Sequence, residues 1–199
     1  MDLPPIHLEH EFEPLPPELY CVASGQPFHS CITCECDLLQ DGVSYVLEKA
    51  VRFYPVDQVY DVAFEYAMCL NCAHRLRQEL SPDSRSNIDA YFSQNVDMVA
   101  RREALLSLPN PLRLDNWLSH CMITGTPREA CKEYQIYAQC YGKDLLYTYM
   151  PYMISGEALE EIQDLISPHT RQILDDFMDT HFGLPPELRA MLQDRLILI

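Results

Sequence analysis

Hydrophobic positions recur with two different periods along the 199-residue chain. The stretch GVSYVLEKAVRFYPV (42–56) is rich in β-branched and aromatic residues, which predicts strands entered through a turn at Gly42. The stretch VYDVAFEY (59–66) predicts a further strand, with every second residue apolar. Directly after it, apolar residues recur at helical spacing: Leu70, Ala73, Leu76 and Leu80. The first half of the chain therefore predicts a β-hairpin followed by a helix.

Further helices are predicted downstream, and together they indicate an α+β fold. Residues 82–107 follow the cap signal Ser81-Pro82, and GEALEEIQDLI (156–166) follows Ser155. The final segment, LPPELRAMLQDRLILI (184–199), predicts a terminal helix with one apolar face, made by Leu188, Leu192, Leu196 and Ile199. Four parts are expected: an extended acidic and proline-rich arm (1–20), a first unit (21–108), a second unit (121–182) and a C-terminal helix (183–199).

The charge balance restricts the class of partner. The chain has 30 acidic and 14 basic residues, which gives a formal net charge of −16. Such a field repels phosphate backbones, so nucleic-acid binding is disfavoured and a protein partner with a basic surface is expected. No apolar run approaches the roughly 20 residues that a membrane-spanning helix needs, and the amino terminus lacks a signal-peptide pattern. We therefore expect no membrane partner and a cytoplasmic location.

Two CxxC pairs carry the most specific chemistry in the sequence. They are CITC (Cys31, Cys34) and CLNC (Cys69, Cys72), and the second pair opens the predicted helix. Four thiolates match the tetrahedral preference of zinc, and a two-residue spacer lets one turn aim both sulfurs at one ion. The pattern predicts one structural zinc per chain. Four buried thiols without metal and a redox pair are the alternatives, and Cys36 or His74 could replace one ligand.

The order of a cysteine turn, a β-hairpin and a helix that opens on a second cysteine pair resembles the treble-clef group of zinc fingers. The resemblance covers residues 31–80, less than a third of the chain, and it names no specific family. It implies a fold in which the metal substitutes for a hydrophobic core. Some treble-clef proteins are nucleases, with a histidine on the hairpin, but this hairpin has no histidine.

The second half of the chain repeats parts of the first. CVASGQPFHSC (21–31) and CMITGTPREAC (121–131) share the frame C-x3-G-x-P-x3-C, and LSPDSRSNIDAYF (80–92) matches ISPHTRQILDDFM (166–178). We interpret this as a duplication with a shortened middle, although Ser-Pro is also a common helix start. The second offset places Ser155 on Cys69 and Ala158 on Cys72. The second unit is therefore expected to be a degenerate, metal-free copy, with Ser155 capping its helix.

Four further cysteines are distributed over the two units: Cys21 in the first, and Cys121, Cys131 and Cys140 in the second. They could form a second zinc site, with His120 as a further ligand. The alternative is that Cys21 and Cys121 are equivalent small buried residues in the two copies.

Nothing in the sequence forms a recognised catalytic set, and no cofactor other than zinc is indicated. The prediction is a non-catalytic, zinc-binding protein-interaction or scaffolding protein. A small metal-supported enzyme of the nuclease-like treble-clef type and a zinc-dependent nucleic-acid-binding regulator are the alternatives. The apolar terminal helix either docks on its own core or forms an interface, including one between copies of the chain. The acidic positions after residue 156 either form a solvated face or recruit a basic partner.

Overall fold

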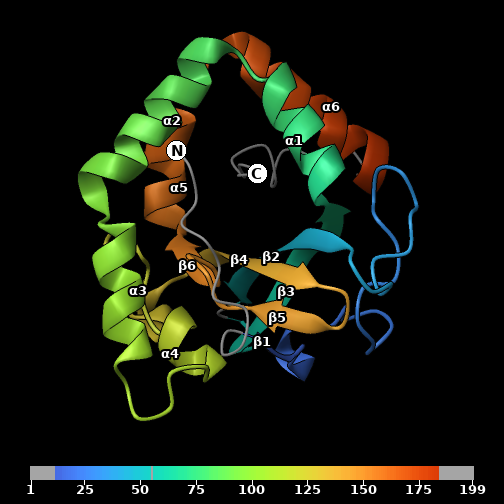
Figure 1. The fold of residues 1–199 in the computed structure, drawn as a ribbon. Coiled ribbons are helices and arrows are strands. Elements are labelled where there is room, and N and C mark those ends of the chain that lie inside the picture. The colour runs from blue at the N-terminus through green and yellow to red at the C-terminus, as the bar shows by residue number, and fades with distance from the viewer. Residues whose placement is uncertain (1–11, 55, 184–199) are drawn as a thin grey trace.

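The computed structural model describes residues 12–54 and 56–183 (Figure 1). It is a mixed α+β structure built on one six-stranded antiparallel sheet. The strands are β1 (Phe12–Pro14), β2 (Ser44–Tyr54), β3 (Val59–Cys69), β4 (Glu133–Tyr141), β5 (Asp144–Leu146) and β6 (Tyr152–Ser155). The helices are α1 (Leu70–Glu79), α2 (Pro82–Asn95), α3 (Met98–Leu106), α4 (Leu114–Leu118), α5 (Gly156–Gln163) and α6 (Pro168–Phe182), with short 3-10 turns η2 (Pro17–Leu19) and η3 (Arg128–Ala130).

The predicted hairpin is confirmed as β2 and β3, two strands of 11 residues each. They pair from Tyr45↔Cys69 to Tyr54↔Val59, with one irregularity after Ala50. The pairing carries the chain directly from the last residue of β3 into α1. The second cysteine pair therefore lies where a strand becomes a helix.

The centre of the sheet is the pairing of β2 with β4, which runs from Ser44↔Tyr141 to Arg52↔Glu133. The strand order is β1-β5-β4-β2-β3, and β6 also pairs with β4. One sheet thus runs through residues of both predicted units. Helices α1, α2, α5 and α6 lie on the same side of it (Figure 1).

Helix boundaries follow the cap signals, with one difference from expectation. Ser81 caps α2 by accepting a hydrogen bond from the Ser84 backbone N–H. The single helix expected over 82–107 is instead two helices. The chain becomes extended at Val96 (φ −137°), and Asp97 then caps α3 by accepting from the Ala100 N–H at 2.9 Å. An Asp at the N-cap position starts a new helix, even where apolar residues continue at helical spacing, because its side chain accepts a hydrogen bond from a backbone N–H group of the first turn.

The ends of the chain are described only in part. From the predicted arm, β1 pairs with β5 and η2 follows, so its described part belongs to the body of the protein. Residues 1–11 and the predicted helix over 184–199 lie outside the described residues.

The amino ends of α2 and α6 meet through reciprocal hydrogen bonds. The Ser81 N–H donates to Thr170 Oγ1 at 3.0 Å, and the Ser167 N–H donates to Ser84 Oγ at 2.8 Å. Both helices begin with Ser-Pro and are capped by that serine. The cluster ties segments 86 residues apart in the sequence.

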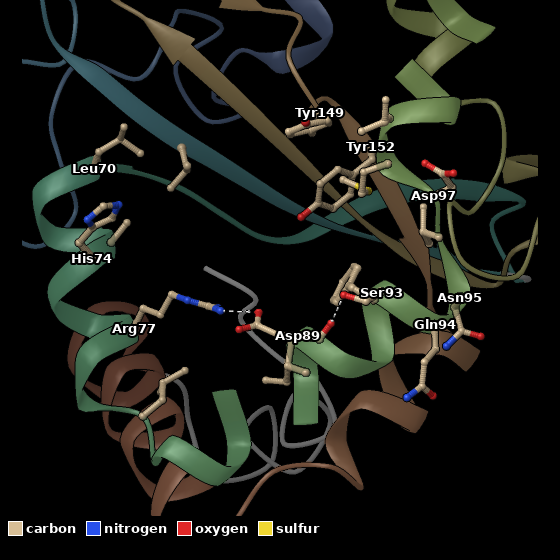
Figure 2. Close-up of a pocket in the computed structure, with 18 of the residues that line it drawn as sticks. Leu70, His74, Arg77, Asp89, Ser93, Gln94, Asn95, Asp97, Tyr149 and Tyr152 are labelled. Carbon is tan, nitrogen blue, oxygen red and sulfur yellow. Dashed lines mark hydrogen bonds and ion pairs between the residues drawn. The ribbon is translucent and has the colours of Figure 1, made fainter. Parts of the chain in front are cut away.

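A cavity of about 840 Å³ lies between the helices and the sheet (Figure 2). Residues of α1, α2, α6, β2 and β6 contribute to its wall. None of the described helices is both long and apolar enough to cross a lipid bilayer.

Candidate metal centre

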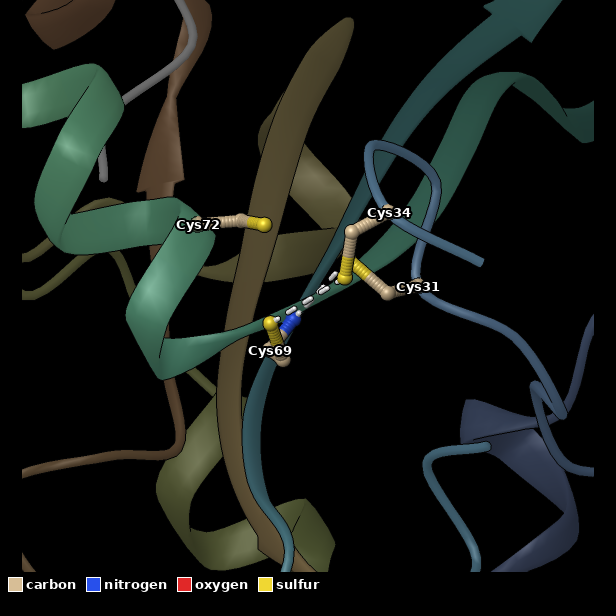
Figure 3. A group of neighbouring side chains, drawn as sticks. All are labelled: Cys31, Cys34, Cys69 and Cys72. Carbon is tan, nitrogen blue, oxygen red and sulfur yellow. Dashed lines mark hydrogen bonds between the residues drawn. The ribbon is translucent and has the colours of Figure 1, made fainter. Parts of the chain in front are cut away.

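The first cysteine pair lies in a tight turn that projects its two side chains toward the start of α1 (Figure 3). The Cys31 N–H donates to the Cys36 carbonyl at 3.0 Å, and the Glu35 N–H donates to the Cys31 carbonyl at 2.9 Å. Glu35 has φ +60°, a left-handed conformation that closes the turn. The backbone therefore holds Cys31 and Cys34 on one side of a compact loop.

The second pair is positioned by β3 and α1. Cys69 is the last residue of β3 and the N-cap residue of α1, and Cys72 follows in the first helical turn. The turn docks on this junction through two hydrogen bonds. The Ile32 N–H donates to the Ala67 carbonyl at 2.9 Å, and the Cys69 N–H lies 3.4 Å from Cys31 Sγ.

The four sulfur atoms converge on one point. All lie within 4.8 Å of one another, and Cys34 Sγ and Cys69 Sγ are 3.8 Å apart. A tetrahedral zinc ion with bonds of about 2.3 Å places its sulfurs about 3.8 Å apart. Three of the cysteines are buried and Cys34 is exposed at the edge. The group could hold one metal ion, with all four tetrahedral positions taken by sulfur.

The electrostatics of the group differ from one thiol to the next. A hydrogen bond from the Cys36 backbone lowers the pKa of Cys34 to about 6. Burial raises the pKa of Cys72 to about 12, although Arg75 Nη2 donates to its sulfur at 2.9 Å. A metal ion would have to displace that proton, and the guanidinium and the helix amino end would favour the resulting thiolate.

The two alternative ligands differ in position. Cys36 is not one of the four converging cysteines, but its thiol lies beside them and interacts with those of Cys34 and Cys69. His74 is exposed on α1 and lines the cavity. Within residues 12–54 and 56–183, only these four cysteines form a group of three or more side chains placed to share a metal. Cys21, Cys121, Cys131, Cys140 and His120 do not form a second such group.

A second turn has the local geometry of the first. The Cys121 N–H donates to the Thr126 carbonyl at 2.8 Å, and the Gly125 N–H donates to the Cys121 carbonyl at 2.9 Å. The turn docks on the junction of β6 and α5, where the Met122 N–H donates to the Met153 carbonyl at 3.0 Å. These are the counterparts of the contacts that the Cys31 turn makes with itself and with β3.

The side chains at the second junction are polar or small. The Ser155 N–H lies 3.2 Å from Cys121 Sγ, and the hydroxyls of Ser155 and Thr124 are 3.4 Å apart. Ala158 is fully buried in the first turn of α5. Ser155 occupies the N-cap position, but its side chain makes no capping hydrogen bond, so the expected cap is wrong.

The contacts of Cys121 differ from those expected from its sequence match with Cys21. Cys21 and Gly25 form the same kind of turn as Cys121 and Gly125, as their shared frame predicts. Cys121, however, contacts the β6–α5 junction as Cys31 contacts the β3–α1 junction. By its contacts, Cys121 corresponds to Cys31. The sequence comparison matched Cys121 with Cys21 because both turns contain a glycine and a proline at the same spacing. The Cys31 turn has no such glycine, because Glu35 takes the left-handed position there.

Sequence reasoning did not identify Arg75 as part of the centre. Its signal was the i+3 spacing from Cys72, which places the two side chains together on a helix. No protein-family model, curated protein or solved structure matches the chain, so the centre and its surroundings are the basis for assigning a function.

Proposed function

We propose that this chain is a non-catalytic protein-interaction or scaffolding protein whose shape depends on one zinc ion held by Cys31, Cys34, Cys69 and Cys72. The convergence of four sulfurs within 4.8 Å carries the proposal. Four thiolates fill a tetrahedral shell, so no position remains for a water or a substrate. The ion would join the first turn, the end of β3 and the start of α1, which is a structural role.

The surface charge indicates the class of partner. The chain carries −16, and α5 and α6 present exposed carboxylates: Glu157, Glu160, Glu161, Asp164, Asp175 and Asp176. Fields of this sign attract basic protein surfaces and repel phosphates. We assign the acidic surface of α5 and α6 to a basic protein partner.

Zinc analysis of the purified chain tests the metal. We expect about one zinc per chain, and Cys69→Ser should release the ion and unfold at least the first unit, because metal binding and folding are coupled. Cys131→Ser is the matched control, since Cys131 is also buried but lies outside the group of four. A chain purified under native conditions that is metal-free and equally stable would contradict the proposal.

Charge reversal tests the binding surface. Glu157 and Glu160 are exposed on α5, and Asp164 is exposed at its C-cap. Replacing all three with lysine should abolish cross-links to basic proteins in extracts of the native host. Asp41→Lys, Asp57→Lys and Glu79→Lys together make the same charge change at scattered exposed sites and should retain them. Equal loss in both variants, retention in both, turnover in nuclease assays or tight binding of bulk DNA or RNA would each count against this function.

We further propose that residues 121–182 are a metal-free copy of the first unit (21–108). Matching hydrogen bonds support this, since the turns at Cys31 and Cys121 dock alike on a strand–helix junction. Both units run from the turn through antiparallel strands into two helices, although β5 lies between β4 and β6 and α3 follows α2. β2 pairs with β4 at the centre of the sheet. In this interpretation Thr124, Ser155 and Ala158 stand where three ligands stood.

Restoring the ligands tests the duplication. Thr124→Cys, Ser155→Cys and Ala158→Cys together with Cys121 should raise the zinc content from one to two per chain. Cobalt substitution should double the thiolate-to-metal absorbance at unchanged band position, which reports a second four-sulfur site. Thr126→Cys in place of Thr124→Cys is the control and should leave one ion. A folded triple variant that still binds one ion would refute the correspondence.

A further inference from the structure

Five thiols, rather than four, lie at the candidate metal centre, and they differ in exposure. Cys31, Cys69 and Cys72 are buried, whereas Cys34 and Cys36 are exposed. A tetrahedral zinc ion binds four sulfurs. The three buried sulfurs therefore leave one tetrahedral position, and two exposed thiols lie beside it.

The backbone of the first turn places Cys36 on the same face as Cys31. Ser30 and Asp37 form an antiparallel bridge, and inside it the Cys31 N–H donates to the Cys36 carbonyl at 3.0 Å. Residues 31 and 36 are thus directly opposite each other, and the side chains of opposed residues leave the same face of an antiparallel pair. The thiol of Cys36 accordingly reaches that of Cys69 at the junction of β3 and α1.

The thiol of Cys36 also lies beside that of Cys34. The second turn has the same closeness at the corresponding positions, where the hydroxyl oxygens of Thr124 and Thr126 are 2.9 Å apart. In the described part of the chain, the Thr126 hydroxyl bonds to Thr124 and not to Ser155. Only the first turn therefore carries this second side chain to its strand–helix junction.

We propose that Cys36 is an alternative fourth zinc ligand, which takes the tetrahedral position when Cys34 leaves it. The inference rests on the proposed zinc site and concerns how that site retains its ion. As the Cys36 sulfur binds zinc, its thiol proton passes to the Cys34 sulfur, whose bond to zinc breaks. Four thiolates and the same net charge remain around the ion.

Retention follows from the place of the two thiols in one turn. Cys34 is the exposed member of the four, so its bond to zinc is the one that an external chelator or thiol can reach. Cys36 stands two residues away and competes for the vacated position at an effective concentration on the order of millimolar or higher. The ion is then held again before the external ligand completes its removal.

Serine variants of the full chain test the proposal. Cys34→Ser should retain about one zinc per chain, and its cobalt form should keep the thiolate-to-metal absorbance of a four-sulfur site. Cys34→Ser combined with Cys36→Ser should bind the ion at least about tenfold more weakly, and bound cobalt should show three sulfurs. Cys34→Ser combined with Cys21→Ser is the matched control, because Cys21 lies outside the group, and it should behave as Cys34→Ser alone.

The rate of zinc release completes the test. Cys36→Ser should keep zinc but pass it to excess chelator about tenfold faster than wild type. A three-sulfur cobalt spectrum in Cys34→Ser, or a wild-type release rate in Cys36→Ser, would overturn the proposal and leave the zinc site standing. Loss of zinc in Cys36→Ser alone would make Cys36 a permanent ligand and also overturn it. A wild-type chain without zinc would instead refute the proposed function, and this inference with it.

Discussion

Lys49 and Glu65 are charged residues in the sheet, on neighbouring strands. Their side chains are 4% and 12% exposed, and Lys49 Nζ lies 2.9 Å from a Glu65 carboxylate oxygen. Both also bind the chain that covers them: Lys49 Nζ donates to the Tyr20 carbonyl, and Glu65 Oε1 accepts from the Val22 N–H at 2.6 Å. The pair therefore joins residues 20–22 to the sheet.

Removing one partner of this pair leaves the other charge buried. Lys49→Met should lower the free energy of unfolding by about 3–5 kcal/mol, the usual effect of an uncompensated buried charge. Denaturant unfolding measures it. The double variant Lys49→Met, Glu65→Leu should recover much of the loss, because the pair itself contributes little net stability. A single variant within about 1 kcal/mol of wild type would contradict this account.

Glu48 is a buried acid on the opposite face of β2. Its Oε2 accepts from Tyr66 Oη at 2.7 Å, and burial raises its pKa well above the ordinary value of 4.5. There is therefore a range of pH in which the Glu48 carboxyl is protonated in the folded protein and ionised in the unfolded protein. Unfolding then releases a proton, so this residue makes stability fall as pH rises above 4.5.

The variant Glu48→Gln removes this titration while keeping the size of the side chain. Its stability relative to wild type should increase with pH between 5 and 8, by at most about 1.4 kcal/mol per pH unit. Denaturant unfolding at several pH values with saturating zinc measures the difference, because zinc binding changes with pH in both proteins alike. A difference that is constant with pH would show that Glu48 is ionised in the folded state.

At the scale of the elements, two helix caps share one hydrogen-bond cluster. Ser81 and Ser167 each cap their own helix, and their hydroxyls are 3.0 Å apart. Ser81→Ala and Ser167→Ala should each cost about 1 kcal/mol. The double variant should deviate from additivity by at least about 0.5 kcal/mol, because residues in one network are coupled. Additive losses in thermal or denaturant unfolding would mean that the caps act separately.

Among the elements, the hairpin and the helix starts were the most predictable. β2 follows from the aromatic and β-branched residues after Gly42, β3 follows from the alternating apolar residues in 59–66, and the start of α2 follows from Ser81-Pro82. The break at Val96–Asp97 was not predicted, because the apolar period continues through it. The failed cap at Ser155 has a similar cause: the residue type fits a cap, while the structure places its hydroxyl beside Thr124.

At the scale of the whole molecule, one sheet joins the two predicted units through β2 and β4. Loss of the proposed zinc ion should therefore affect more than the first unit. A strong chelator should lower the midpoint of thermal unfolding, and the transition should stay single, because the β2–β4 pairing and the shared core couple both halves. Far-ultraviolet circular dichroism and calorimetry measure it. Two separate transitions, of which only one responds to chelator, would show that the units fold independently.

The sequence by itself determined which four cysteines form the candidate metal centre, and the order of the local elements. Two CxxC spacings place Cys31, Cys34, Cys69 and Cys72 on a turn and a helix start, and these choices depend on neighbours in the chain. Only the tertiary structure decided the β2–β4 pairing, the contact of Arg75 with Cys72, the contact of Cys121 with the β6–α5 junction and the cavity. These features are contacts between residues that are distant in the sequence, or they depend on how the helices pack on the sheet. The spacing of apolar residues along the chain does not specify such contacts or such packing.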